Sequence, residues 1–214
     1  MNKNELFKLI DHTKLAPTST IKEIRTLCKE AVEYGTASVC IPPCYIQTVK
    51  KEFPALNICT VIGFPLGYST AEAKVFETKD AVEKGADEID MVINLCLVKN
   101  KEFDAVLSEI KAVKAACGGK LLKVIIETCY LTEEEKIKLC EIVTMAGAEF
   151  IKTSTGFGTA GAKPEDIVLF KNNIGPDVKI KAAGGIRTKA DIENYAELGC
   201  SRIGASSAIK ALNE

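Results

Sequence analysis

Residues 88–92 of the chain read Glu-Ile-Asp-Met-Val, so charged and apolar side chains alternate there. Successive side chains of a β-strand point to opposite faces, which places Glu88 and Asp90 together on one face of such a strand. The same alternation recurs at 123–127, 150–152 and 178–181. This pattern indicates strands with one apolar face for packing and one face that carries charge.

Short β-branched runs alternate along the whole chain with longer amphipathic stretches, as in parallel strands joined by helical crossovers. The stretch 19–34 has apolar residues at helical spacing, and Thr132 precedes three glutamates that suit a helix N-terminus. Glycine follows four predicted helices where a left-handed C-cap favours it, at positions 35, 85, 147 and 199. Eight strands are predicted, at 9–13, 37–41, 58–63, 88–94, 121–127, 149–153, 178–183 and 202–205.

Eight strand–helix units in 214 residues predict a single-domain (β/α)8 TIM barrel that spans residues 1–214. An open, doubly wound sheet is the structural alternative, but the turn at 12–17 has no G-x-G-x-x-G pattern. The outer face of a barrel packs on helices and must be apolar. The charged faces should therefore point toward the barrel axis.

Composition excludes several classes of function. The chain has 28 Lys and Arg against 29 Asp and Glu, so it has no excess of positive charge for binding a nucleic acid. Its first ten residues lack the apolar region of a signal peptide, and no apolar run approaches the ~20 residues of a membrane span. We therefore expect a cytoplasmic protein without nucleic-acid or membrane partners.

The cysteine pattern argues against a metal site. Most of the nine cysteines lie in apolar runs, where reduced and buried thiols are expected. The spacing of Cys40 and Cys44 fits neither a redox motif nor a zinc knuckle, and His12 is the only histidine. Catalysis by a Ser–His or Cys–His pair would depend on that one imidazole. We expect no cysteine cluster, no metal and no cofactor.

Three charged residues fall near the carboxyl ends of predicted strands, where barrel enzymes place their chemistry: Asp90, Lys152 and Lys181. An amine attacks a carbonyl only when it is unprotonated, and a free lysine has a pKa of ~10.4. Burial and a second ammonium nearby lower that pKa. We therefore interpret Lys152 and Lys181 as a nucleophile and its activator, and Asp90 as a group that moves protons. Schiff-base formation is the reaction class that follows.

Other charged residues on these faces favour a structural interpretation. Glu88, Lys123 and Lys179 should lie one layer deeper as ion pairs, and Asp11 should join from the first strand. In that position Lys179 would add to the repulsion around Lys181, unless Glu88 or Glu127 neutralised it.

Glycine-rich turns follow the last three predicted strands. A glycine in such a turn is more often a turn residue than a ligand, but three turns at the same end of a barrel are typical of a phosphate site. The substrate should therefore carry a phosphate. The predicted phosphate and substrate ligands are Thr155, Gly156, Gly184, Gly185, Ser206 and Ser207.

Together these motifs resemble the deoxyribose-phosphate aldolase family, and the resemblance runs the length of the chain. It implies a metal-free class I aldolase of deoxyribose phosphate catabolism, which interconverts 2-deoxy-D-ribose 5-phosphate with D-glyceraldehyde 3-phosphate and acetaldehyde. Lys152 matches the Schiff-base lysine of the family, Lys181 its second lysine, and Asp90 its proton-transferring aspartate. His12 resembles a structural hydrogen-bonding residue. The blocks that carry the resemblance are 10–13, 39–42, 61–67, 88–94, 150–157, 181–187 and 202–207.

Two other functions stay open. Another Schiff-base barrel aldolase or transaldolase would share the lysine chemistry and differ in its sugar. A non-catalytic sugar-phosphate-binding barrel would keep the glycine turns without needing Lys181 beside Lys152. The expected partner is a small-molecule sugar phosphate, and the chain could also form a homo-oligomer, either a dimer or a tetramer.

Overall fold

The eight strands form one closed parallel sheet in the computed structural model, which describes all residues from Met1 to Glu214. Each strand pairs with its neighbour in sequence, and the last strand pairs with the first. The predicted TIM barrel is confirmed, and each strand ends within two residues of its expected bounds. The strands are β1 (Ile10–Thr13), β2 (Ser38–Ile41), β3 (Ile58–Ile62), β4 (Glu88–Val92), β5 (Leu121–Ile125), β6 (Phe150–Lys152), β7 (Lys179–Ala183) and β8 (Arg202–Ala205).

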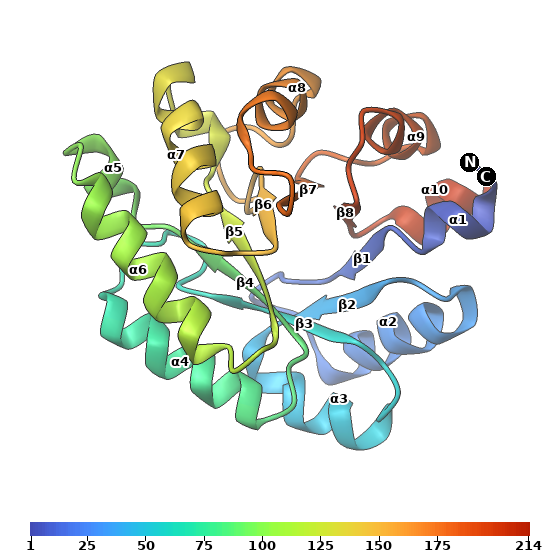
Figure 1. Cartoon of the computed structure of the whole chain (residues 1–214). Helices are drawn as coiled ribbons and strands as arrows, with labels where there is room; N and C mark the ends of the chain where they lie inside the picture. Colours follow the sequence, from blue (N-terminus) through green and yellow to red (C-terminus); the bar gives the residue numbers. More distant parts are fainter.

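Helices surround this sheet, and α1 and α10 bring the two ends of the chain together (Figure 1). Two short 3-10 turns, Pro43–Tyr45 and Thr128–Tyr130, follow β2 and β5. The helices are α1 (Lys3–Phe7), α2 (Ile21–Tyr34), α3 (Ile46–Glu52), α4 (Ala71–Glu83), α5 (Leu95–Lys99), α6 (Phe103–Ala116), α7 (Glu133–Met145), α8 (Pro164–Asn173), α9 (Lys189–Glu197) and α10 (Ala208–Asn213).

Local sequence signals explain where several helices begin and end. Thr132 caps α7 and forms a capping box with Glu135, which satisfies two backbone N–H groups at that end. Thr20 does the same for α2 with Glu23. Gly35 ends α2 with φ 66°, a left-handed conformation that glycine adopts without strain.

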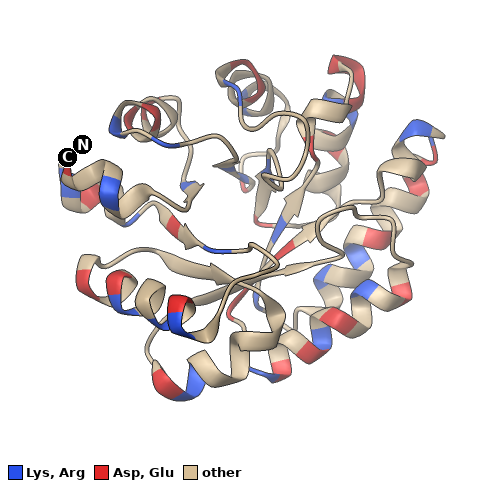
Figure 2. Cartoon of the chain, turned by 180° about the vertical axis from the view of Figure 1, so that it is seen from behind, with Lys and Arg blue, Asp and Glu red and all other residues tan.

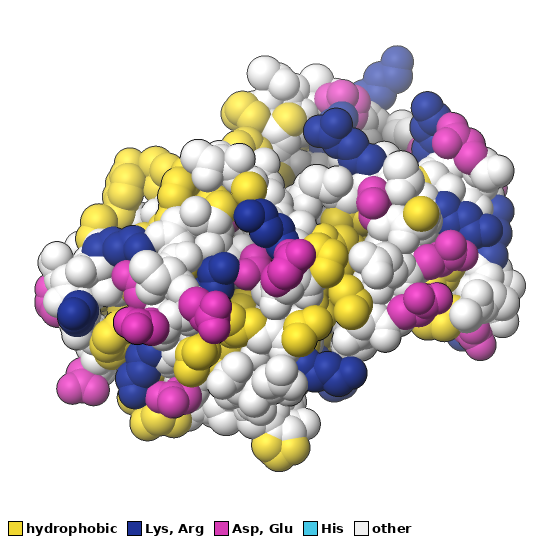
Figure 3. Space-filling model, turned by 90° about the horizontal axis from the view of Figure 1, so that it is seen from above, with side chains coloured by type: hydrophobic (Ala, Val, Ile, Leu, Met, Phe, Trp, Pro, Cys, Tyr) yellow, Lys and Arg dark blue, Asp and Glu magenta, His cyan; other side chains and the backbone are white.

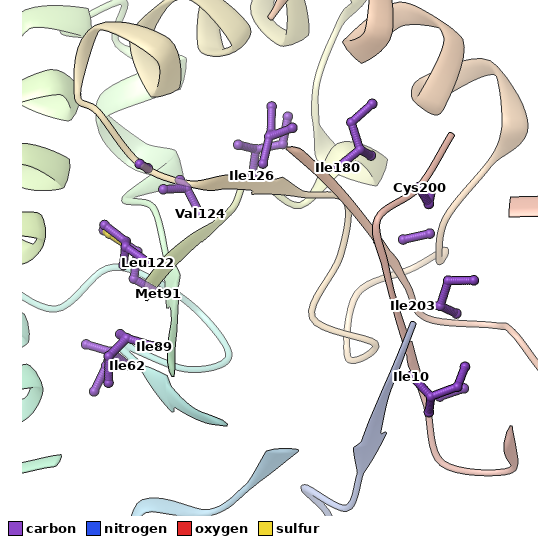
Figure 4. Close-up of a cluster of buried hydrophobic side chains, with 14 of the residues drawn as sticks. Ile10, Ile62, Ile89, Met91, Leu122, Val124, Ile126, Ile180, Cys200 and Ile203 are labelled. Carbon is purple, nitrogen blue, oxygen red and sulfur yellow. The ribbon is translucent and has the colours of Figure 1, made fainter. Parts of the chain in front are cut away.

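The outer face of the barrel is apolar and packs against the helices. Ile89 and Met91, which alternate with the carboxylates of β4, are fully buried in this layer. Figure 4 shows them among aliphatic side chains from other strands. Burial of these side chains drives the packing of the helix layer onto the strands.

The inner face of the barrel carries charge, as the alternation predicted. Lys181 of β7 binds Asp90 of β4, and Lys123 of β5 lies 3.6 Å from Asp11 of β1. These strands are not neighbours, so the contacts cross the interior. Figure 2 shows charged residues on the strands as well as on the outer helices.

Lys179 is an exception, and the expectation that it lies inside the barrel was wrong. It is the first residue of β7 and is exposed to solvent. The ring of Phe150, its partner in β6, is only 3% exposed, and the Lys179 Nζ lies 5.9 Å from the centre of this ring. Phe150 therefore closes the amino end of the barrel and leaves Lys179 outside it.

The outer surface mixes charged and hydrophobic side chains. On the face in Figure 3, hydrophobic groups lie between charged groups of both signs. None of the helices combines the length and the apolar character needed to cross a lipid bilayer.

Candidate active site

Asp90 is the centre of the charged interior. Its Oδ2 accepts hydrogen bonds from the Nζ atoms of Lys152 and Lys181, each at 2.7 Å. Its Oδ1 accepts from the Nζ of Lys123 at 2.7 Å and from the Sγ of Cys59 at 3.1 Å. The structure thus brings together the three residues that the sequence predicted as catalytic.

The three lysines around Asp90 differ in their number of carboxylate partners. Lys123 has Glu88 at 2.6 Å, Asp90 at 2.7 Å and Asp11 at 3.6 Å. Lys181 binds Asp11 and Asp90. Lys152 forms an ion pair with Asp90 alone. Lys152 therefore has the fewest carboxylate partners of the three lysines.

The pKa values of this cluster reflect the same contacts. Burial alone would raise the pKa of Asp90, but the three ammonium groups outweigh it and hold this pKa well below its usual range. Burial alone would lower the pKa of Lys181, yet the carboxylates of Asp11 and Asp90 raise it above its ordinary value. Burial also lowers the pKa of Lys123, but nearby negative charges, that of Asp90 above all, raise it well above its ordinary value. Asp90 is therefore a carboxylate and Lys181 and Lys123 are cations at neutral pH.

Beneath this upper layer of Asp90, Lys152 and Lys181 lies a deep layer of Glu88, Lys123 and Arg202. Arg202 donates to Glu88 at 2.9 Å and to Asp11 at 2.5 Å, and its guanidinium lies over the Phe150 ring. Glu88 and Lys123 form the ion pair expected of them. Arg202 supplies the further cation of this layer, which had been expected from Lys179.

A cavity of about 210 Å³ opens beside Lys152 at the carboxyl end of the strands. Lys181, Asp90 and Lys123 do not line it, so Lys152 is the member of the cluster that the cavity reaches. Five predicted phosphate and substrate ligands line this cavity: Thr155, Gly156, Gly184, Gly185 and Ser206.

Ser207 is placed differently from the other predicted ligands. It lines neither this cavity nor the larger one beside it, and its hydroxyl donates to the Arg187 carbonyl at 3.4 Å. The larger cavity, of about 590 Å³, extends from Ser206 and Thr155 toward α2.

Two residues at the site were missed by the sequence analysis. Arg187 lines the smaller cavity beside Gly184 and Gly185 and could bind an anion there. In the sequence it could have been recognised as a cation two residues after the Gly-Gly turn. Glu127 is buried just beyond β5 and binds Thr155. In the sequence it could have been recognised as a charged residue at a strand end, the feature that identified Lys152.

The prediction that the chain has no cysteine cluster was wrong. Cys40 and Cys59 are paired in register on β2 and β3, and their sulfur atoms lie within 4.8 Å of each other and of an Asp90 oxygen. Such thiol and carboxylate atoms could ligate a metal ion. However, the ammonium of Lys123 already contacts both Cys59 and Asp90. The expectation of a metal-free site stays a prediction.

The other cysteines and the histidine make no contact with the three lysines, although His12 lines the larger cavity. Six of the nine cysteines are buried, whereas Cys44 and Cys96 are exposed. The Nε2 of His12 lies 2.8 Å from the carboxylate of Glu30 in α2. His12 therefore links β1 to α2, as a structural residue would.

Comparisons with known proteins identify relatives of this chain. The chain matches the family model described as "DeoC/LacD family aldolase" over residues 6–213. It is 57% identical over 213 residues to a deoxyribose-phosphate aldolase of Clostridium botulinum, covering 99% of this chain and 96% of that protein. It is 56% identical over 208 residues to a deoxyribose-phosphate aldolase of Clostridioides difficile, covering 97% and 95% of the two chains.

Solved structures show the same fold. A deoxyribose phosphate aldolase from Aeropyrum pernix, described as tetrameric, has a TM-score of 0.92 and 34% identity, covering 99% of this chain and 91% of that one. An aldolase named QR15 has a TM-score of 0.94 and 39% identity, covering 97% of this chain and 94% of that one. These similarities extend over all eight strands.

Proposed function

This chain belongs to the DeoC/LacD family of aldolases, and on that premise we propose that it is a class I deoxyribose-phosphate aldolase. The reaction is the reversible cleavage of 2-deoxy-D-ribose 5-phosphate into D-glyceraldehyde 3-phosphate and acetaldehyde, through a Schiff base on Lys152. One barrel domain, residues 1–214, carries it out. The reaction would serve the catabolism of deoxyribose phosphate.

One observation carries the choice of Lys152. It is the lysine of the buried cluster that has a single carboxylate partner and also lines the cavity. Both features favour reaction, because the amine must lose its proton and must reach the substrate carbonyl. Lys123 and Lys181 have more carboxylate partners and do not line the cavity.

The covalent steps follow from the chemistry of an amine and an aldehyde. The neutral Nζ of Lys152 attacks C1 of the open-chain sugar, and loss of water gives an iminium ion. This cation accepts the electron pair of the C2–C3 bond as that bond breaks, because two carbons leave as acetaldehyde. The C3 hydroxyl loses its proton and becomes the aldehyde of glyceraldehyde 3-phosphate. The enamine left on Lys152 is protonated at C2, and hydrolysis of the resulting iminium frees acetaldehyde.

Asp90 and Lys181 handle charge and protons in this scheme. Asp90 accepts a hydrogen bond from Lys152, so it can exchange a proton with that amine, and its low pKa favours passing the proton on over keeping it. Lys181 stays cationic and shares the Oδ2 of Asp90 with Lys152. Its charge is therefore held next to Lys152, where we propose that it acts as the activator of the nucleophile.

The phosphate of the substrate would lie at the glycine turns. Gly184 and Gly185 have φ of 83° and 78°, and these turns let the backbone approach a ligand closely. Ser206 and Arg187 line the same cavity and supply a hydroxyl and a guanidinium. These groups recognise a phosphate by hydrogen bonds and charge.

We also propose that the chain forms a homo-oligomer, either a dimer or a tetramer. The tetrameric Aeropyrum pernix relative supports this proposal. Light scattering of the purified protein measures its mass, and a monomer at micromolar concentration would contradict it.

Acetaldehyde release tests the proposed activity. The purified protein should release acetaldehyde and glyceraldehyde 3-phosphate in equal amounts from 2-deoxy-D-ribose 5-phosphate. Another aldolase or a transaldolase would release no acetaldehyde, and a binding protein would leave the sugar intact.

A further inference from the structure

Glu127 holds an unusual backbone conformation next to the site. It is only 2% exposed and has φ 52° and ψ 67°, in the left-handed region that residues with a side chain rarely adopt. The backbone on either side is bound to β6 and the residue after it. The N–H of Ile126 donates to the Lys152 carbonyl at 3.1 Å, and that of Thr128 donates to the Thr153 carbonyl at 2.9 Å. The strained residue is therefore held in place from both sides.

The carboxylate of Glu127 binds both donors of Thr155. The Thr155 N–H lies 3.1 Å from Oε1 and 3.3 Å from Oε2, and the Thr155 hydroxyl donates to Oε2. The oxygen of this hydroxyl accepts from the N–H of Phe157 at 3.0 Å. A hydroxyl has one hydrogen, so a carboxylate, which only accepts, sets the direction of this chain of hydrogen bonds.

The segment bound in this way forms part of the wall of both cavities. Thr155 lines both of them, Gly156 lines the smaller one and Phe157 lines the larger one. Glu127 lines neither. Any effect of its carboxylate on a ligand must therefore pass through Thr155 and its neighbours.

We propose that Glu127 is a positioning residue that fixes the loop after β6, through Thr155, in the conformation that binds the sugar phosphate. This inference rests on the proposed function. The positioning role gives a reason for an arrangement that is costly to the fold, because burying a carboxylate is unfavourable unless it is well bonded. Burial accordingly raises the pKa of Glu127. A glutamine would avoid this cost, but its NH2 group would face the donors of Thr155.

The first test compares Glu127→Gln with Glu77→Gln as a matched control. Glu77 also accepts a backbone N–H, that of Gly63 at 2.8 Å, and burial also raises its pKa, but it lines neither cavity. In Glu127→Gln the KM for 2-deoxy-D-ribose 5-phosphate should rise by about tenfold to a hundredfold, the range for losing a hydrogen bond to a charged group. The kcat should stay within about twofold of the parent value. Glu77→Gln should change neither constant.

Trapping with acetaldehyde and borohydride separates this inference from the proposed function. Acetaldehyde has no phosphate, so Glu127→Gln should still form the reduced adduct on Lys152 at the parent rate. No adduct in the parent protein would overturn the proposed function itself. A normal adduct with an unchanged KM in Glu127→Gln would overturn the role of Glu127 alone.

A double-mutant cycle tests whether Glu127 acts through Thr155. Thr155→Val removes the hydroxyl, and Thr155→Ser keeps it. Thr155→Val should raise the KM, and Thr155→Ser should leave it near the parent value. Adding Glu127→Gln to Thr155→Val should raise the KM by less than Glu127→Gln does in the parent, because only the contact with the backbone N–H of residue 155 remains to be lost. Independent, multiplying effects on the KM would contradict a positioning role. The Thr155 pair also keeps the proposal testable if Glu127→Gln fails to fold.

Discussion

The two charged layers inside the barrel share burial and ion pairing but differ in how many partners each lysine has. In the deep layer, Lys123 contacts three carboxylates and lies away from the cavity. In the upper layer, Lys152 contacts one carboxylate and lines the cavity. Burial alone therefore does not identify a reactive lysine. In our proposal, the number of anionic partners and access to the cavity distinguish the structural amine from the reactive one.

The largest expected effect comes from replacing the upper-layer amine with a cation that cannot form an imine. Lys152→Arg should lower the rate of sugar cleavage by about 10³-fold or more, because a guanidinium stays protonated. The fold should survive, since the positive charge beside Asp90 is kept. Activity is measured by acetaldehyde release and folding by circular dichroism. Substantial sugar cleavage by the folded variant would show that the upper-layer amine, Lys152, is not the reactive lysine.

Removing the deep-layer amine should instead affect stability. Lys123→Met removes the closest cation of Glu88 and one of the three lysines that contact Asp90, and should lower the free energy of unfolding by about 3–5 kcal/mol. Lys152→Met removes a contact to one carboxylate that keeps two other cations, and should cost about 1–3 kcal/mol. Urea unfolding at neutral pH measures both. Equal losses would show that partner number does not set the structural role.

Lys181 differs from both Lys123 and Lys152, because it belongs to the upper layer but does not line the cavity. If its charge keeps Lys152 deprotonated, Lys181→Leu should raise the pKa of Lys152 and move the alkaline rise of the rate to higher pH. Imine formation near neutral pH should slow by about tenfold to a hundredfold, since each unit of pKa shift is a factor of ten in free amine.

A second role for Lys181 gives a different result. If Lys181 mainly transfers protons, the imine should still form at the parent rate and later turnover should stall. Borohydride-trapped imine, measured against pH in Lys181→Leu, distinguishes the two roles. Unchanged turnover would rule out both and place Lys181 with the deep-layer lysine.

The smallest effect concerns the phosphate end of the cavity. Ser206→Glu places a carboxylate where the phosphate is expected, and should weaken the binding of 2-deoxy-D-ribose 5-phosphate by about tenfold while leaving acetaldehyde trapping intact. Ser207→Glu should have less effect, because Ser207 does not line the cavity. Equal damage to the use of both substrates would place the phosphate elsewhere.

Much of this arrangement could be predicted from local patterns. The alternation in 88–92 placed Asp90 inside the barrel, and the position of Lys152 at a strand end placed it at the site. The same rule failed for Lys179. Alternation places the Lys179 side chain on the inner face of β7, but the ring of Phe150 closes the barrel and leaves Lys179 outside. This closure depends on the packing of another strand, β6, which the sequence around Lys179 does not show.

Contacts between distant parts of the chain could not be predicted in this way. Cys40 and Cys59 meet because β2 and β3 pair in one register, which residue spacing does not reveal. Glu127 was expected to continue the inner face of β5. The strand ends at Ile125 instead, and the left-handed turn lets Glu127 bind Thr155. Both contacts depend on register and loop geometry.

Mapping the trapped adduct tests most directly the claim that Lys152 is the reactive amine because it has the fewest carboxylate partners. The protein is incubated with acetaldehyde, reduced with borohydride and digested, and each lysine is examined by mass spectrometry. We predict a two-carbon adduct on Lys152 and none on Lys123 or Lys181. An adduct confined to Lys181 or Lys123 would contradict it.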